Sequence, residues 1–167
     1  LDQGIGEIMR FLEENPVVGV VGPQIVCPDG TVQLSCRSWP GYKTAVFNRS
    51  SLLTRLLPDN PHSREYLKTD WDHSSTKEVD WVSGCCLLHR RQVATEIGGL
   101  DEAFFMYCED VDFCRRARLV GWTIVYAPAM RVLHHIGGSS RTVRRRMILE
   151  QHRSMWRYYR KHFNGGR

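Results

Sequence analysis

The stretch IGEIMRFLEENPVVGVV, residues 5–21, decides the fold class of this chain. Residues 5–12 place apolar side chains at helical spacing, which predicts an amphipathic helix. Asn15-Pro16 ends that helix, and Val17–Val21 is a β-branched run of the kind that is buried in a parallel or mixed sheet. A helix followed by a buried strand predicts an α/β fold, with a mixed sheet flanked by helices.

The composition is that of a single globular domain. The chain has 167 residues, of which 42% are hydrophobic and 25% charged, and its mean hydropathy is -0.37. These values exclude fibrous, collagen-like and disordered proteins. No apolar run approaches the roughly 18 residues of a membrane span, and the first residues given lack the basic, apolar, small-residue order of a signal peptide. Because no strand precedes the first helix, we expect a fragment of a longer protein.

The cysteines predict a reducing compartment. None of them forms a C-x-x-C pair, and their density is below that of a secreted disulfide framework. We therefore expect free thiols and a cytoplasmic protein. The six are Cys27, Cys36, Cys85, Cys86, Cys108 and Cys114.

Turn residues and apolar runs divide the rest of the chain into short elements. In the first half we expect a hairpin of residues 24–27 and 32–35 around Pro28–Thr31, a helix at 45–57 and a surface loop at 58–77. We then expect a strand at 79–89 bent at Gly84, and helices at 90–97 and 109–119 that end at glycines. The last strands are expected at 123–126 and 130–134, around Pro128.

The carboxyl-terminal segment 141–167 is strongly basic. Nine Lys and Arg residues against the single acid Glu150 give it a charge of +8, so residues 1–140 carry -3 of the total of +5. The basic side chains suit either a solvated helix face or a polyanionic partner such as nucleic acid, anionic lipid or a phosphorylated ligand. Helical spacing predicts that an opposite, apolar face packs on the protein, formed by Met147, Met155, Trp156, Tyr159 and Phe163.

An acidic cluster begins the predicted helix 109–119. Glu109, Asp110 and Asp112 follow the aromatic run at Phe104 and Phe105. Acids are stabilised at a helix start by the unpaired amides there, which is the purely structural interpretation. A carboxylate beside aromatic side chains also suits a general base that faces a sugar-like acceptor. Both interpretations are open from the residues alone.

A second polar cluster spans residues 134–141. A histidine at a strand end, such as His134, can bind a metal, and a Gly-Gly-Ser-Ser loop before a basic helix can present amides and hydroxyls to phosphate. His135 is expected on the opposite face of the strand. The plain alternative is a flexible turn with one packed histidine.

Three segments together resemble a known family. The segments VDWVSGCCLL at 79–88, GGLDEAFFMYCEDVDFCRR at 98–116 and HHIGGSS at 134–140 are similar, in order and spacing, to family 2 inverting glycosyltransferases. The rhamnosyltransferase-like branch is the most similar, and the resemblance covers nearly the whole chain. It implies a GT-A fold whose acceptor-side part is residues 1–140, followed by a basic helix at 141–167.

The resemblance also implies an activity: transfer of a sugar, with rhamnose as one candidate, from a nucleotide-diphosphate donor to a glycan or lipid-linked acceptor, with inversion. It assigns the general base to Asp110 with Glu109 as its neighbour. Trp81, Gly84 and Asp112 would lie on the acceptor side, although Asp112 also suits a brace of the helix. It assigns His134 to the metal or diphosphate, and the diphosphate loop to Ser139, Ser140 and Arg141.

The segment that carries the family's Asp-x-Asp motif would precede Leu1. We therefore expect the complete enzyme to hold Mn²⁺ or Mg²⁺, and this chain alone to be inactive and to lack a full metal site. Missing strands would leave a sheet edge open to self-association. We expect such an enzyme to be cytoplasmic, with peripheral contact with an anionic membrane as one candidate interaction and no nucleic-acid partner.

Two other classes of protein remain as alternatives. One is a binding module whose arginine-rich tail contacts nucleic acid or an anionic membrane. The other is a structural zinc site, for which the ligand spacing is poor. Its candidate ligands are Cys108, Cys114, His134 and His135.

Overall fold

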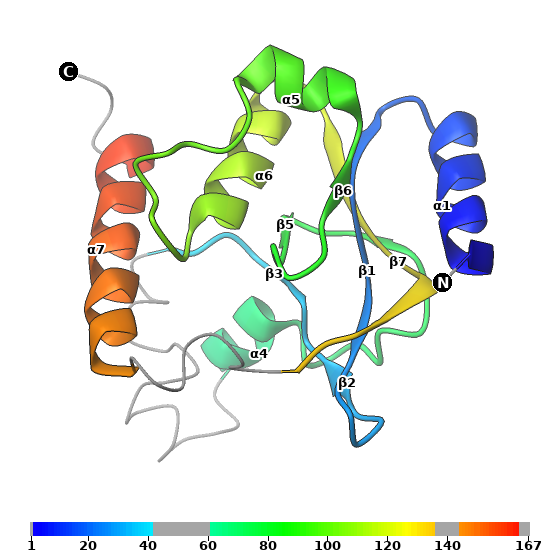
Figure 1. Cartoon of the computed structure of the whole chain (residues 1–167), viewed down its shortest axis with the longest axis horizontal. Helices are drawn as coiled ribbons and strands as arrows, with labels where there is room; N and C mark the ends of the chain where they lie inside the picture. Colours follow the sequence, from blue (N-terminus) through cyan, green and yellow to red (C-terminus); the bar gives the residue numbers. More distant parts are fainter. Residues whose placement is uncertain (1, 42–60, 136–143, 164–167) are drawn as a thin grey trace.

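The computed structural model describes residues 2–41, 61–135 and 144–163, which form a mixed β-sheet with helices around it (Figure 1). The α/β expectation is thus confirmed. The elements, in chain order, are α1 (Asp2–Glu14), β1 (Val18–Val26), β2 (Val32–Gln33), β3 (Cys36–Arg37), α4 (Pro61–Leu67), β4 (Lys77–Glu78), β5 (Trp81–Val82), β6 (Leu88–His89), α5 (Arg91–Ile97), α6 (Glu109–Leu119), β7 (Thr123–Leu133) and α7 (Arg144–Phe163).

Strand β1 is the centre of the sheet, and it extends beyond the predicted run of valines. It pairs in parallel with β7 and antiparallel with β2 and β6, while β4 pairs antiparallel with β7. The β1–β2 pair is the predicted hairpin. On one face of the sheet, α1 packs Ile8 and Leu12 against Val21 and Val125. On the other face, α5, α6 and α7 enclose the larger core.

The single strand expected at 79–89 is wrong. Its residues form two short strands in different sheets: β5 pairs with β3, and β6 pairs with β1. The chain turns between them because the amide of Gly84 donates a hydrogen bond to Asp110 instead of to a neighbouring strand. Strand β1 passes close beneath β5, since a Cβ added to Gly22 would lie 2.5 Å from Cγ1 of Val82.

Two further expectations need correction. The strands expected at 123–126 and 130–134 are one strand, β7, whose pairing with β1 shifts between Ala127 and Arg131. Pro128 lies in that irregularity, where its missing N–H breaks no ladder bond. The surface loop expected at 58–77 contains helix α4, which the core stabilises through the buried ring of Tyr66. The helix expected at 45–57 falls outside the described residues.

Helices α5 and α6 agree with the sequence, whereas α7 differs in its packed face. Helix α5 ends at Gly98, whose φ of 78° is the left-handed conformation that glycine adopts readily. Helix α6 has the expected bounds. Helix α7 packs on the core through Tyr158, Ser154 and Met147, but Trp156 is 58% exposed, so its assignment to the packed face is wrong. None of the helices described has the length and apolarity that spanning a bilayer requires.

Candidate functional site

The carboxylates of Glu109 and Asp110 stand at the first turn of α6, after a strained stretch of backbone. Tyr107 and Cys108 both have positive φ, 68° and 67°, although neither is glycine. Such conformations cost free energy and persist where the surrounding structure holds them. The side chain of Cys108 is buried in the core, and this anchor fixes the position of the two acids that follow.

Asp110 lies against the turn that follows β5. Its Oδ2 accepts a hydrogen bond from the amide of Gly84, and its Oδ1 accepts one from the amide of Val111, both at 2.8 Å. A Cβ on Gly84 would lie 3.3 Å from the Cβ of Asp110, so glycine permits this close approach. The predicted base and one predicted acceptor-side residue, 26 positions apart, are therefore in direct contact.

Burial raises the pKa of Asp110 above its usual range, although the hydrogen bonds from Gly84 and Val111 and the charge of Arg37 oppose this. Burial also raises the pKa of Glu109, and the neighbouring charge of Asp110 adds to the effect. Oε2 of Glu109 is buried without a hydrogen-bond partner among the described residues. A carboxylate with a raised pKa is a stronger base, which is the property that proton removal from a hydroxyl requires.

Trp81 does not offer a stacking platform for a sugar ring, contrary to expectation. Its side chain is 5% exposed, and its indole N–H donates to the carbonyl of Ser38. The guanidinium of Arg37 covers the ring, with Cζ 5.3 Å from the centroid. Trp81 therefore belongs to the core beneath the site rather than to its surface.

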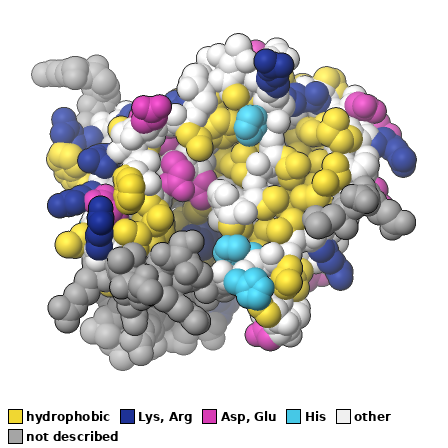
Figure 2. Space-filling model, viewed as in Figure 1, with side chains coloured by type: hydrophobic (Ala, Val, Ile, Leu, Met, Phe, Trp, Pro, Cys, Tyr) yellow, Lys and Arg dark blue, Asp and Glu magenta, His cyan; other side chains and the backbone are white. Residues whose placement is uncertain are grey.

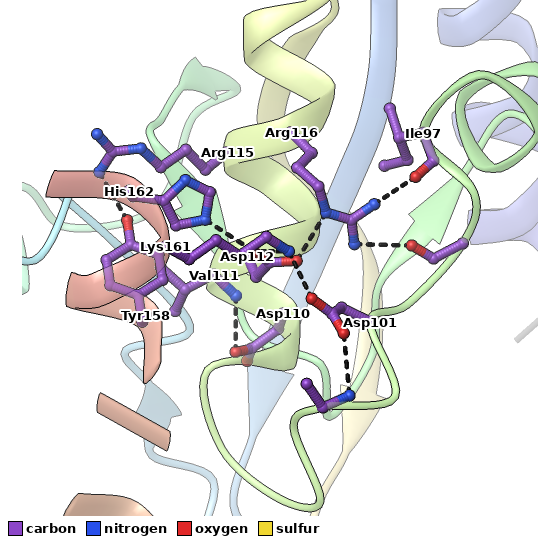
Figure 3. Close-up of polar contacts among 12 residues, drawn as sticks. Ile97, Asp101, Asp110, Val111, Asp112, Arg115, Arg116, Tyr158, Lys161 and His162 are labelled. Carbon is purple, nitrogen blue, oxygen red and sulfur yellow. Dashed lines mark hydrogen bonds and ion pairs between the residues drawn. The ribbon is translucent and has the colours of Figure 1, made fainter. Parts of the chain in front are cut away.

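Asp112 is an internal ion-pair centre (Figure 3). Its side chain is 0% exposed. It contacts Arg116 on its own helix at 2.7 Å, and Lys161 and His162 on α7 at 2.8 and 2.7 Å. Its burial between two helices argues against acceptor contact and supports the alternative that Asp112 braces the helix. Asp110, two residues earlier, points instead to the turn at Gly84.

Arg37 was missed by the sequence analysis. It lies on β3, where it pairs with Trp81 of β5, and its charge acts on Asp110. Its Nε is buried without a hydrogen-bond partner among the described residues. No local signal marks Arg37, because it reaches the site only through the pairing of two strands more than 40 residues apart.

We expect Arg37→Met, made in the whole enzyme, to shift the acidic limb of the kcat/KM pH profile to higher pH. The positive charge of Arg37 lowers the pKa of Asp110, so its loss lets that pKa rise, and the base becomes protonated at a higher pH. Arg37→Lys keeps the charge and is the matched control. A limb that stays in place, or moves equally in both variants, would contradict this role.

His134 directly follows β7 and comes more than 20 residues after the carboxylates of α6 in the sequence. Its backbone N–H donates to Val26, and its Nδ1 is 2.9 Å from Oε1 of Gln33. The remaining ring nitrogen could bind a metal, with Gln33 orienting the ring. The described residues contain no group of three or more His, Cys, Asp or Glu side chains that could hold a metal ion. Ser139, Ser140 and Arg141 lie outside the described residues.

The zinc alternative finds no support in the described part of the chain. Cys108 and Cys114 are buried in the core, where burial raises the pKa of each thiol to about 12. All six cysteines are free, as expected. Neutral thiols inside an apolar core are poor metal ligands.

A family model described as glycosyltransferase-like family 2 matches residues 35–163 of this chain. That range covers the turn at Gly84, the carboxylates of α6 and the whole of α7. The chain belongs to this family. The resemblance seen in the sequence is thus confirmed, and the mixed sheet flanked by helices is consistent with a family 2 GT-A domain.

Two of the curated relatives of this chain are named as rhamnosyltransferases. The N-acetylglucosaminyl-diphospho-decaprenol L-rhamnosyltransferase of Mycobacterium tuberculosis is 40% identical over 120 residues, which are 72% of this chain and 38% of that protein. Rhamnosyltransferase WbbL of Escherichia coli is 34% identical over 48% of this chain and 30% of its own length. The O-antigen biosynthesis protein RfbC of Myxococcus xanthus is 31% identical over 84% of this chain and 10% of its own length.

This family 2 chain therefore spans less than two fifths of the length of these relatives. No solved structure matches it. The comparisons support a transferase and give no support to a nucleic-acid-binding module.

Proposed function

We propose that this chain is the acceptor-side part of an inverting rhamnosyltransferase. The donor would be a nucleotide-diphosphate rhamnose, and the acceptor a lipid-linked glycan on the cytoplasmic side of a membrane. The names of the relatives from M. tuberculosis and E. coli support rhamnose as the sugar, and the decaprenol in the first name supports a lipid-linked acceptor.

The observation that carries the proposal is the setting of Asp110. Its carboxylate is held by two backbone amides, follows two strained residues, and has a raised pKa. In the proposed step Asp110 takes the proton of the acceptor hydroxyl while the oxygen attacks the anomeric carbon. The bond to the nucleoside diphosphate breaks on the opposite face, so the configuration inverts.

The leaving diphosphate needs positive charge, since negative charge accumulates on it as the bond breaks. We assign the contacts with the leaving diphosphate to His134 and to Ser139, Ser140 and Arg141. A Mn²⁺ or Mg²⁺ ion in the whole enzyme would stabilise the same charge. The described residues contain no complete metal site, so we propose that other parts of the whole protein supply further ligands.

The test is transfer by the whole enzyme to an N-acetylglucosaminyl-diphospho-polyprenol, with a panel of nucleotide sugars as donors. We expect transfer from the rhamnose donor, with the product linkage inverted relative to the donor by NMR. Retention of configuration would refute the single-displacement step. Transfer of another sugar alone would refute the donor while leaving the role of Asp110 intact.

A further inference from the structure

Helix α7 carries an outward stripe of alternating cationic and apolar side chains. The stripe is defined here as Arg146, Leu149, Arg153, Trp156 and Arg160, whose spacing of three and four residues places them on one side of a helix. Leu149 and Trp156 are 59% and 58% exposed. In Figure 2 hydrophobic and basic side chains lie side by side along the edge where Figure 1 draws α7.

The stripe is presented rigidly, because other side chains of α7 fasten the helix to the domain. Ser154 donates to the carbonyl of Met106, and Arg157 donates to that of Ala103, both at 2.8 Å. The ring of Tyr158 is fully buried. These contacts hold the segment that leads into Glu109 and Asp110, so the stripe and the candidate base are joined through one short loop.

Apolar surface continues from the stripe onto that loop. Phe105 is 65% exposed, and Cζ of Arg146 lies 5.9 Å from its ring centroid. Cζ of Arg160 lies 4.6 Å from the ring of Trp156. Arginine beside an exposed aromatic ring suits the boundary between lipid headgroups and acyl chains, where the ring enters the apolar layer and the cation stays with the phosphates.

The charge of α7 matches an anionic surface. From Arg144 to Phe163 the helix has seven Lys and Arg residues and one acid, Glu150. That acid is buried beneath the stripe, where it pairs with Arg153 at 2.7 Å. A shallow groove of about 370 Å³ beside the stripe is lined by Arg157 and Lys161, and by Asp101, which pairs with Lys161.

We propose that the stripe of α7, together with Phe105, docks on an anionic lipid bilayer. The combination of charge and exposed apolar side chains favours a membrane over nucleic acid, since a phosphate backbone attracts the arginines but offers Leu149 and Trp156 no apolar partner. The proposal stands on the surface of α7 and does not depend on sugar transfer.

The test is sedimentation of the chain with vesicles of phosphatidylcholine containing 30 mol% phosphatidylglycerol, compared with pure phosphatidylcholine. We expect binding to the anionic vesicles only, weakened by 0.5 M salt. The double variant Arg153→Gln/Arg160→Gln should bind about 25-fold more weakly, from about fivefold for each lost cation. Trp156→Ala should bind about tenfold more weakly because it removes the side chain that enters the bilayer.

Arg91→Gln on α5 and Leu119→Ala on α6 are matched controls, since both side chains are exposed away from α7. They should bind within twofold of the unmodified chain, and circular dichroism should show every variant folded. Failure of the folded chain to bind anionic vesicles would overturn the proposal. The proposal would also be overturned if Trp156→Ala bound the vesicles as well as the unmodified chain. It would be overturned too if the chain bound duplex DNA more tightly than the vesicles and only the arginine variant weakened that binding.

Discussion

Asp110→Asn, made in the whole enzyme, is expected to lower kcat about 1000-fold, within the range that loss of a general base produces. The amide has nearly the same shape as the carboxylate, and its oxygen can still accept one of the bonds from the amides of Gly84 and Val111. It cannot take a proton from an acceptor hydroxyl. The loss should therefore fall on turnover, while calorimetry with the nucleotide sugar should find donor binding unchanged.

Glu102→Gln is the control for this prediction. Glu102 is an exposed acid of the same loop, and its substitution removes one negative charge without touching the first turn of α6. It should leave kcat within twofold of the unmodified enzyme. Near-normal turnover of the Asp110 variant would remove Asp110 as the base. An equal loss in both variants would indicate that only the charge of the region matters.

Asp112→Asn is expected to destabilise the fold by about 3 kcal/mol at pH 7. The substitution removes the buried negative charge that Arg116, Lys161 and His162 share, so their hydrogen bonds then end on a neutral amide, and breaking an ion pair whose carboxylate is buried is costly. Urea unfolding measures the difference directly. In a domain of this size the same loss corresponds to a fall in Tm of about 9 °C.

The effect of Asp112 should depend on pH with a definite sign. Burial raises the pKa of Asp112, but hydrogen bonds from His162, Lys161 and Arg116 outweigh it and lower that pKa to about 2. A carboxyl whose pKa is lower in the folded state stabilises the fold above its unfolded pKa, near 4. This contribution, about 2 kcal/mol, is lost as pH falls from about 4 to about 2. The difference in free energy of unfolding between the unmodified chain and Asp112→Asn should therefore become smaller over that pH range.

Asp101→Asn is the matched control for Asp112. Its carboxylate pairs with the same Lys161, at 2.6 Å, but its side chain is 30% exposed. Because water screens an exposed pair, the variant should lose less than about 1 kcal/mol. If the two variants were equally destabilised, burial would not be what makes Asp112 important.

Local signals in the sequence were reliable where an element depends on its own residues. The bounds of α6 and the end of α5 at Gly98 follow from acids at a helix start and glycine at a helix end. The hairpin of β1 and β2 follows from the Pro-Asp-Gly turn. The order of motifs along the chain was sufficient to identify the family.

Predictions from the sequence failed where residues far apart in the chain decide how a segment packs. The run at 79–89 has the apolar character of one strand, but Gly84 bonds to Asp110 and the chain turns there. The aromatic ring of Trp81 suits stacking on a sugar, but the pairing of β3 with β5 places Arg37 over that ring. Helical periodicity on α7 included Trp156 in the packed face, whereas the contacts of Tyr158 and Ser154 set the actual orientation of the helix.

The sequence by itself determined that a cluster of acids begins a helix in a family 2 glycosyltransferase domain. The tertiary structure decided that Asp110 lies at the turn of Gly84 and that Asp112 forms buried ion pairs. Two residues apart on a helix, Asp110 and Asp112 point in directions about 200° apart. The packing of α7 against one side of α6 buries Asp112 among cations, and the turn at Gly84 receives Asp110 on the other. Spacing along a helix separates the two carboxylates, but only the neighbours on each side give them different chemistry.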